Sequence, residues 1–142
     1  MTMDIKLLIE EALKARKFSY TPYSRFRVGA ALLSRDGQIF TGCNIENAGY
    51  TPSNCAERTA FFKAVSQGVL EFQAIAVAGG PEDALELDYC APCGVCRQVM
   101  MEFCDPESFQ IILAKNPEEY QIRTLGEILP MGFGPKNLER KR

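Results

Sequence analysis

The sequence of 142 residues contains no histidine. Histidine is the commonest general base and the commonest metal ligand in proteins, so its absence removes both at once. Serine–histidine and cysteine–histidine nucleophilic pairs are excluded, and with them hydrolysis through the usual acyl-enzyme. Proton transfer is therefore left to a carboxylate, cysteine, tyrosine or lysine, and a transition metal must be held by thiolates or carboxylates.

Long apolar runs are also missing from the sequence. The first ten residues already include acidic ones and do not build the apolar run of a secretory signal. No stretch approaches the ~18 apolar residues of a membrane span. We therefore expect a cytoplasmic protein without a membrane partner, in which the six cysteines are thiols. In that compartment, clustered cysteines indicate a metal site first and a redox pair second.

An excess of charge of either sign is absent, because 16 Lys and Arg residues stand against 18 Asp and Glu residues, for a net charge of −2. This balance provides no general attraction to phosphate backbones or anionic membranes, so nucleic acid is not an expected partner. The length and the hydrophobic content of 46% suit one globular domain whose core needs no disulfide bonds. We assign this domain to residues 1–134 and a polar tail to residues 135–142.

Apolar periodicity and turn signals predict the order α-β-β-α-β-α-β-β-α. Apolar residues recur at helical spacing between Asp4 and Arg16, and Asp36-Gly37 marks a hairpin between two strands. The predicted elements after the first helix are strands at 26–34 and 38–44, a helix at about 55–67 capped by Ser53 or Asn54 and ended at Gly68, a strand at 72–78 ended by Gly79-Gly80-Pro81, a helix at 93–104, strands at 111–114 and near 120–123, and a short helix with a capping box at Thr124 and Glu127.

The apolar runs at residues 72–78 and 111–114 are typical of strands that are buried on both faces. Such strands need helices above and below the sheet. The fold class predicted is therefore α/β, a three-layer α-β-α sandwich with one mixed sheet of about five strands.

Three cysteines fall at the predicted starts of two helices. Cys55 begins one helix, and Cys93 and Cys96 lie at the start of the next. Helix N-termini favour thiolates because their N–H groups and dipoles are positive. Three protein ligands leave the fourth position of a tetrahedral zinc ion open, which is the catalytic rather than the structural arrangement. The spacing indicates one Zn²⁺ per subunit, held by these three residues.

Other roles of the cysteines are compatible with the same spacing: buried apolar side chains, a thioredoxin-like redox pair, or a closed structural site with four cysteines. Cys90 forms a second C-x-x-C motif with Cys93, and Cys43 or Cys104 could complete a tetrahedron. Cys93 and Cys96 are the preferred pair because they lie within the helix start, whereas Cys90 lies in the preceding loop.

Charged residues beside these cysteines have candidate roles. Glu57 follows Cys55 by two positions, so it can approach water at the metal without being a ligand; its alternative is a carboxylate favoured by the helix dipole. Three thiolates outweigh the charge of zinc and raise the pKa of its water. Arg58 and Arg97 could withdraw that charge through hydrogen bonds to sulfur, or form surface salt bridges instead. For Arg58, the hydrogen bond to a ligand sulfur is preferred over a surface salt bridge.

A Cys-x-Glu element followed by Pro-Cys-x-x-Cys is a known signature of zinc-dependent nucleobase deaminases. Four segments in order resemble the small homotetrameric cytidine deaminases, and they are residues 23–31, 42–48, 54–60 and 92–98. The resemblance runs from the first helix to about Phe133. It implies a cytidine deaminase-like fold and the hydrolysis of cytidine and 2′-deoxycytidine to uridine and 2′-deoxyuridine with release of ammonia. In that reaction Glu57 takes a proton from water and delivers protons to N3 and the leaving amine.

The same resemblance implies roles for further residues. It assigns Asn44 and Glu46 to the ribose hydroxyls, Phe26 to the pyrimidine and Ala56 to the substrate site. Phe133 is implied to reach the site of a neighbouring subunit, so the resemblance implies a homotetramer with composite active sites. Without the resemblance, Asn44 and Glu46 would be a polar sheet edge, and the two phenylalanines would be ordinary core residues.

The chain departs from the family pattern at two places. Cys90 precedes Ala91-Pro92, where the family commonly has Ser-Pro, and the loop at residues 49–52 differs, which bears on fine specificity. Three other functions are alternatives: a deaminase of modified nucleosides, a nucleic-acid base editor on the same fold, and a non-catalytic zinc or redox module. The Asn-x-Glu motif disfavours a deaminase of modified nucleosides. The net charge disfavours a base editor, despite a small basic cluster at residues 136–142. The third leaves Glu57 without a role.

Overall fold

The computed structural model describes residues 3–138. The elements along the chain are α1 (Ile5–Arg16), β1 (Phe26–Ser34), β2 (Ile39–Cys43), α2 (Ala56–Ser66), β3 (Phe72–Pro81), α3 (Gly94–Phe103), β4 (Gln110–Asn116), β5 (Glu119–Thr124), α4 (Leu125–Ile128) and the 3-10 helix Pro135–Leu138. This order confirms the predicted one and adds a helical turn within the segment predicted as a polar tail. No helix in the described part of the chain is both long and apolar enough to cross a membrane.

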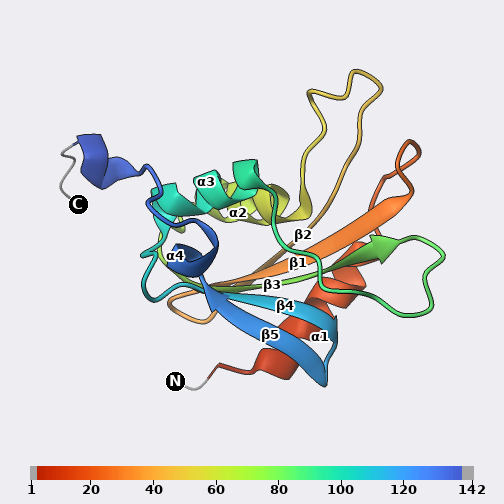
Figure 1. Cartoon of the computed structure of the whole chain (residues 1–142), viewed down its shortest axis with the longest axis horizontal. Coiled ribbons are helices and arrows are strands. Elements are labelled where there is room, and N and C mark those ends of the chain that lie inside the picture. Colours follow the sequence, from red (N-terminus) through yellow and green to blue (C-terminus); the bar gives the residue numbers. More distant parts are fainter. Residues whose placement is uncertain (1–2, 139–142) are drawn as a thin grey trace.

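Within residues 3–138 the strands form one five-stranded mixed sheet in the order β2-β1-β3-β4-β5. Strands β3 and β4 pair in parallel, whereas β1 pairs antiparallel with both β2 and β3, and β4 with β5. Helix α1 covers one face of the sheet, and α2 and α3 cover the other (Figure 1). The predicted α/β sandwich of three layers is confirmed.

The two faces of the sheet carry separate apolar layers because successive side chains of a strand point to opposite sides. In β1, Ala30 and Leu32 pack in the layer of Phe61 from α2. Their neighbour Ala31 packs in the opposite layer with Ile9 from α1. Both helical layers therefore rest on the same central strands, and their positions are set by one sheet.

Strand β3 is longer than predicted. Gly79-Gly80-Pro81 was expected to end it, but these residues continue the ladder with β1 as far as the pair Phe26–Pro81. Strand β4 pairs with β3 only between Ala74 and Val77, so the carbonyls of the extension need another partner. The guanidinium of Arg16 donates to the carbonyl oxygens of Gly80 and Pro81, at 3.0 and 2.8 Å.

The N-caps of α2 and α3 are both cysteines. Ser53 or Asn54 was predicted to cap α2, and this was wrong, because the N-cap is Cys55. The N-cap of α3 is Cys93. Among the described residues, neither thiol makes a side-chain capping hydrogen bond, so both sulfur atoms are left for other contacts.

Several predicted turn and cap signals are confirmed. Gly37, in the hairpin between β1 and β2, has φ of 92°, and Gly68, just beyond the end of α2, has φ of 87°. Both values lie in the left-handed region that glycine adopts without strain. Thr124 and Glu127 form the reciprocal capping box of α4.

Candidate active site

The thiols of Cys55, Cys93 and Cys96 converge on one point. The sulfur of Cys93 lies 3.7 Å from that of Cys55 and 3.6 Å from that of Cys96, and all three sulfurs lie within 4.8 Å of one another. A tetrahedral zinc ion with Zn–S bonds of about 2.3 Å separates its sulfur ligands by roughly 3.8 Å. Donor type and spacing therefore both fit Zn²⁺, with the fourth coordination position left for a small molecule.

The remaining cysteines lie outside this cluster, which is the group of three or more potential metal ligands found in residues 3–138. Burial raises the pKa of Cys90 to about 11, and it also raises the pKa of Cys43 and of Cys104. The cluster contains Cys93 and Cys96 and not Cys90, which agrees with the choice of the second C-x-x-C motif.

The thiols of Cys55 and Cys96 influence each other's pKa. A hydrogen bond with Cys96, followed by those of Arg58 and Cys93, lowers the pKa of Cys55 to about 5. The same bond to Cys55, with burial, raises the pKa of Cys96, which keeps its proton. Within this pair, the shifts favour Cys55 as the thiolate, and metal binding at thiols releases the protons that they carry.

Arginines were predicted to donate to the sulfurs, and the structure separates the two candidates. Nη2 of Arg58 lies 3.2 Å from the sulfur of Cys55, so this guanidinium does withdraw charge from a ligand. The role considered for Arg97 is wrong. Its Nε donates to the carbonyl oxygen of Pro92 at 2.7 Å and its Nη1 to that of Ile128 at 2.6 Å. Arg97 therefore joins the start of α3 to the end of α4.

Glu57 lies in the first turn of α2 and is almost fully enclosed, with 4% of its surface exposed. Burial raises the pKa of its carboxyl group to about 7, and the charge on Cys55 adds to this rise. A carboxyl group with a pKa near neutrality both accepts and releases protons readily. Its neighbour Ala56 is fully buried.

The first turn of α2, which follows Cys55 and contains Glu57, lies very close to β2. A Cβ atom added at Gly42 would meet the carbonyl oxygen of Ala56 at 2.4 Å and the amide nitrogen of Ala60 at 2.6 Å. Real Cβ atoms do not approach backbone atoms so closely. The missing side chain of Gly42 thus sets the distance between the sheet and the helix turn that carries the metal ligand.

The residues assigned to the ribose follow β2 directly rather than lying within it. The side chain of Asn44 accepts a hydrogen bond from the Val28 amide at 2.9 Å and donates to the Phe26 carbonyl at 2.8 Å. The Glu46 carboxylate accepts hydrogen bonds from the backbone amides of Tyr23 and Ser24, at 3.0 and 3.1 Å, and from the Ser24 hydroxyl. Asn44 is thus oriented by the start of β1, and Glu46 by the loop that precedes it.

A hollow of about 340 Å³ opens beside Glu46, and Tyr23, Ser24, Tyr50 and Ser53 also line it. The rings of Tyr23 and Tyr50 meet edge to face, with centroids 5.9 Å apart. The sequence assigned none of these four residues to the substrate site, although Tyr23 and Ser24 belong to a segment that resembles the cytidine deaminases. The signal was therefore present, but the contact with Glu46 is visible only in three dimensions.

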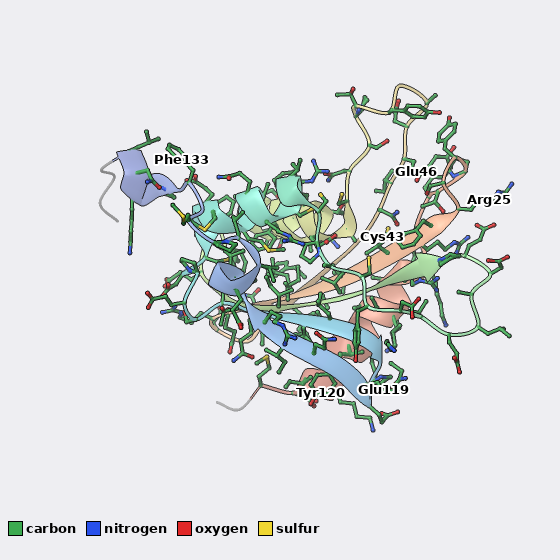
Figure 2. The ribbon with its side chains drawn as sticks, in the orientation of Figure 1. Arg25, Cys43, Glu46, Glu119, Tyr120 and Phe133 are labelled. Atoms are coloured by element: carbon green, nitrogen blue, oxygen red, sulfur yellow. The ribbon has the colours of Figure 1, made fainter. Side chains whose placement is uncertain are left out.

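Phe26 and Phe133 are both partly exposed, at 39% and 57%. Figure 2 shows Glu46 and Phe133 on opposite sides of the chain, with α2 and α3 between them. The carbonyl of Phe133 is held by the side-chain amide of Gln98 at 2.8 Å. The structure therefore does not bring Phe133 together with Glu46 within one chain.

The fold and the site together define a class, an α/β sandwich with a three-cysteine zinc centre at two helix N-termini. A family profile described as "Cytidine and deoxycytidylate deaminase zinc-binding region" matches residues 2–111. The chain therefore belongs to this family of zinc-binding deaminases, as the sequence resemblance predicted.

Individual relatives are similar in sequence over nearly the whole chain. Proteins named "Cytidine deaminase" from Sporosarcina psychrophila and Halalkalibacterium halodurans are 48% and 46% identical to it over 136 residues, covering 96% of this chain and 96% and 98% of theirs. The crystal structure of a cytidine deaminase from Burkholderia pseudomallei is similar, with a TM-score of 0.82 and 45% identity over 92% of this chain and 100% of that one. A cytidine deaminase structure from Mycobacterium tuberculosis matches with a TM-score of 0.76 and 38% identity, covering 94% and 99% of the two chains.

We expect single Cys55→Ala, Cys93→Ala or Cys96→Ala changes to release zinc, because two thiolates do not hold it at a site built for three. Zinc per chain, measured by atomic absorption after dialysis, should fall from about one to near zero. The matched changes Cys90→Ala and Cys104→Ala should leave it near one. Loss of zinc from Cys90→Ala would mean that the overlapping C-x-x-C motif supplies a ligand.

Gly42→Ala should weaken zinc binding because the new methyl group pushes the first turn of α2 away from β2. Its control is Gly29→Ala, where a Cβ would meet the carbonyl oxygen of Ala12 in α1 at 2.0 Å, on the other face of the sheet. We expect both variants to lose about 1–3 kcal/mol of unfolding free energy in denaturant titrations. Only Gly42→Ala should lose about tenfold or more in zinc affinity, measured by chelator competition. Equal zinc affinities in the two variants would contradict this account.

Proposed function

We propose that this protein catalyses the zinc-dependent hydrolytic deamination of cytidine and 2′-deoxycytidine to uridine and 2′-deoxyuridine, with release of ammonia, as a cytoplasmic step of pyrimidine salvage. The observation that carries the proposal is the buried carboxyl group of Glu57 beside the three-cysteine centre. The names of the similar proteins support the choice of substrate.

A zinc ion held by Cys55, Cys93 and Cys96 would act as a Lewis acid and lower the pKa of a water molecule. Glu57 accepts a proton from that water as it attacks C4 of the pyrimidine. The same carboxyl group passes this proton to N3. It then takes the second proton from the hydroxyl group added at C4 and gives it to the leaving amine, so that ammonia departs and C4 becomes a carbonyl. A raised pKa suits both halves of this work, because Glu57 must be a base in one step and an acid in the next.

Arg58 and the two helix N-termini support this chemistry from the ligand side. Three thiolates carry more negative charge than one Zn²⁺ neutralises, which works against the activation of water. The hydrogen bond of Arg58 to Cys55 withdraws part of that charge. The N-cap positions of Cys55 and Cys93 place both thiolates at positive helix ends.

The nucleoside is proposed to lie between this centre and the hollow beside Glu46. Phe26 contacts the pyrimidine, Ala56 lines the substrate site, and Asn44 and Glu46 accept or donate hydrogen bonds to the ribose hydroxyls. Asn44 uses one amide hydrogen and one lone pair within the chain, so a second hydrogen and a second lone pair remain for the sugar.

The active form is proposed to be a homotetramer with composite active sites. Phe133 supports this arrangement because it is 57% exposed and lies far from Glu46 of its own chain (Figure 2). A phenylalanine exposed in this way is available for contact with a second copy of the chain. In the proposed assembly, Phe133 closes the site of a neighbouring subunit and helps to exclude water from the developing charge.

We expect the zinc-loaded protein to convert cytidine and 2′-deoxycytidine to the uracil nucleosides, followed by the loss of ultraviolet absorbance of the cytosine ring. Glu57→Gln should reduce kcat by about three orders of magnitude or more, because the amide keeps the size of the side chain but carries no transferable proton. Zinc content and the far-ultraviolet circular dichroism spectrum should not change. Substantial turnover by the Glu57→Gln variant would remove Glu57 from the mechanism.

Free cytosine and a single-stranded oligodeoxynucleotide serve as negative substrates in the same assay. A closed ribose site should reject both, since the first leaves its polar groups unpaired and the second is too large. Deamination of the oligonucleotide at a comparable rate would instead favour the base-editor function.

Composite sites predict complementation between two inactive variants. Glu57→Gln chains retain Phe133, and Phe133→Ala chains retain Glu57, so a mixed tetramer contains sites with both residues intact. Random mixing after reversible dissociation should restore roughly a quarter of the wild-type activity per site. As a control, the double variant mixed with Glu57→Gln should restore none. A fully active monomer in a sedimentation-coupled assay would contradict the proposed assembly.

A further inference from the structure

The hydroxyl group of Ser24 joins two residues that the proposed function places on different parts of the substrate. It donates a hydrogen bond to Oε2 of Glu46, and it accepts one from the backbone amide of Phe26 at 3.0 Å. A serine hydroxyl has one proton, and the Phe26 amide can only donate, so the proton of Ser24 is directed to the carboxylate. One side chain therefore links the ribose residue to the backbone of the pyrimidine residue.

The carboxylate of Glu46 is almost saturated within its own chain. Its Oε1 atom accepts from the amides of Tyr23 and Ser24, and its Oε2 atom accepts from the Ser24 hydroxyl. A carboxylate offers about four acceptor positions, so about one remains, on Oε2. The hydroxyl of Ser24 therefore decides in which direction the last lone pair of Glu46 points.

The backbone around Ser24 is held in a conformation that few residues adopt. Arg25 has φ of 55°, in the left-handed region. Its amide donates to the carbonyl of Thr21 at 3.0 Å, its carbonyl accepts from the Glu82 amide at 2.8 Å, and its guanidinium pairs with the Glu82 carboxylate at 2.9 Å. Such strain persists only where the surroundings impose it, and it concentrates at functional sites. Here it turns the chain so that Ser24 meets Glu46 while Phe26 enters β1.

We infer that Ser24 is a positioning residue for sugar recognition, which aims the free lone pair of Glu46 at a ribose hydroxyl and holds that carboxylate in register with Phe26. The inference rests on the proposed function and deepens it. The bond from Ser24 also lowers the pKa of Glu46, so the carboxylate stays ionised and remains an acceptor. Ser24 touches neither the pyrimidine nor the metal ligands in this account, so its removal should affect substrate binding and not the chemical step.

The test compares cytidine with 2′,3′-dideoxycytidine, which lacks the ribose hydroxyls on the face proposed to meet Glu46. Ser24→Ala should raise KM for cytidine about tenfold and leave kcat within about threefold, because a hydrogen bond to a charged group is lost. The kinetics with the dideoxynucleoside should hardly change, so the preference for cytidine, as a ratio of kcat/KM values, should fall about tenfold. Ser24→Thr, which keeps the hydroxyl at an exposed position, should restore the preference.

The matched control is Ser66→Ala, which removes a hydroxyl bonded to the Lys63 carbonyl at 2.8 Å at the other end of α2. It should leave the preference unchanged and have a denaturant midpoint close to that of Ser24→Ala. An equal loss of activity with both substrates in Ser24→Ala would make the role of Ser24 merely structural and overturn the inference.

A double-mutant cycle separates this inference from the proposed function. In a Glu46→Ala background, Ser24→Ala should have no further effect on the preference for cytidine, because the two residues act as one unit. Additive effects would overturn the role of Ser24 while leaving Glu46 on the ribose. If Glu46→Ala by itself kept the full preference, the ribose assignment would fail together with the inference built on it.

Discussion

The thiols of Cys55 and Cys93 lie 38 positions apart in the sequence and 3.7 Å apart in space, and the rest of the site depends on this meeting. It requires α2 and α3 to lie on the same face of the sheet, with their N-termini side by side (Figure 1). The apolar layer that both helices share with the sheet provides this arrangement. The close approach of α2 to β2 at Gly42 sets the distance of α2 from the sheet. The relative positions of the ligand thiols at the two helix starts are thus set by the packing of the helices on the sheet.

The absence of histidine explains the electrostatic character of the centre. Thiolates must replace imidazoles, and they bring negative charge that zinc alone does not neutralise. The protein compensates with positive helix ends and with the guanidinium of Arg58 at 3.2 Å from Cys55. The remaining negative field and the burial of Glu57 act in the same direction, because both raise the pKa of its carboxyl group. The negative thiolates that hold the metal therefore also raise the pKa of Glu57, the proposed proton carrier.

The proposed sugar side of the site uses a different device. It is built from loops rather than helices, and two of its residues, Arg25 and Tyr50, have positive φ values without being glycine. Backbone amides and the Ser24 hydroxyl hold the Glu46 carboxylate, so a flexible acidic side chain becomes a fixed acceptor. Phe133 lies elsewhere, on the far side of α2 and α3 (Figure 2). The chain thus places its metal centre on helices and its proposed recognition on loops, and closure of the site is proposed to come from another copy.

The sequence by itself predicted the order of elements and the preferred ligands of the metal, because periodicity, turn residues and a helix start are local signals that neighbours in the chain impose. It did not determine the length of β3, which is supported by Arg16 from α1, or the partner of Arg97, which is a carbonyl in α4. It also suggested a capping serine or asparagine where Cys55 is the N-cap. The contact between Ser24 and Glu46 was equally invisible. For β3, Arg97 and Ser24, the deciding atom belongs to a residue that tertiary packing brings close, and only in the folded chain does such a hydrogen-bonding group find its partner.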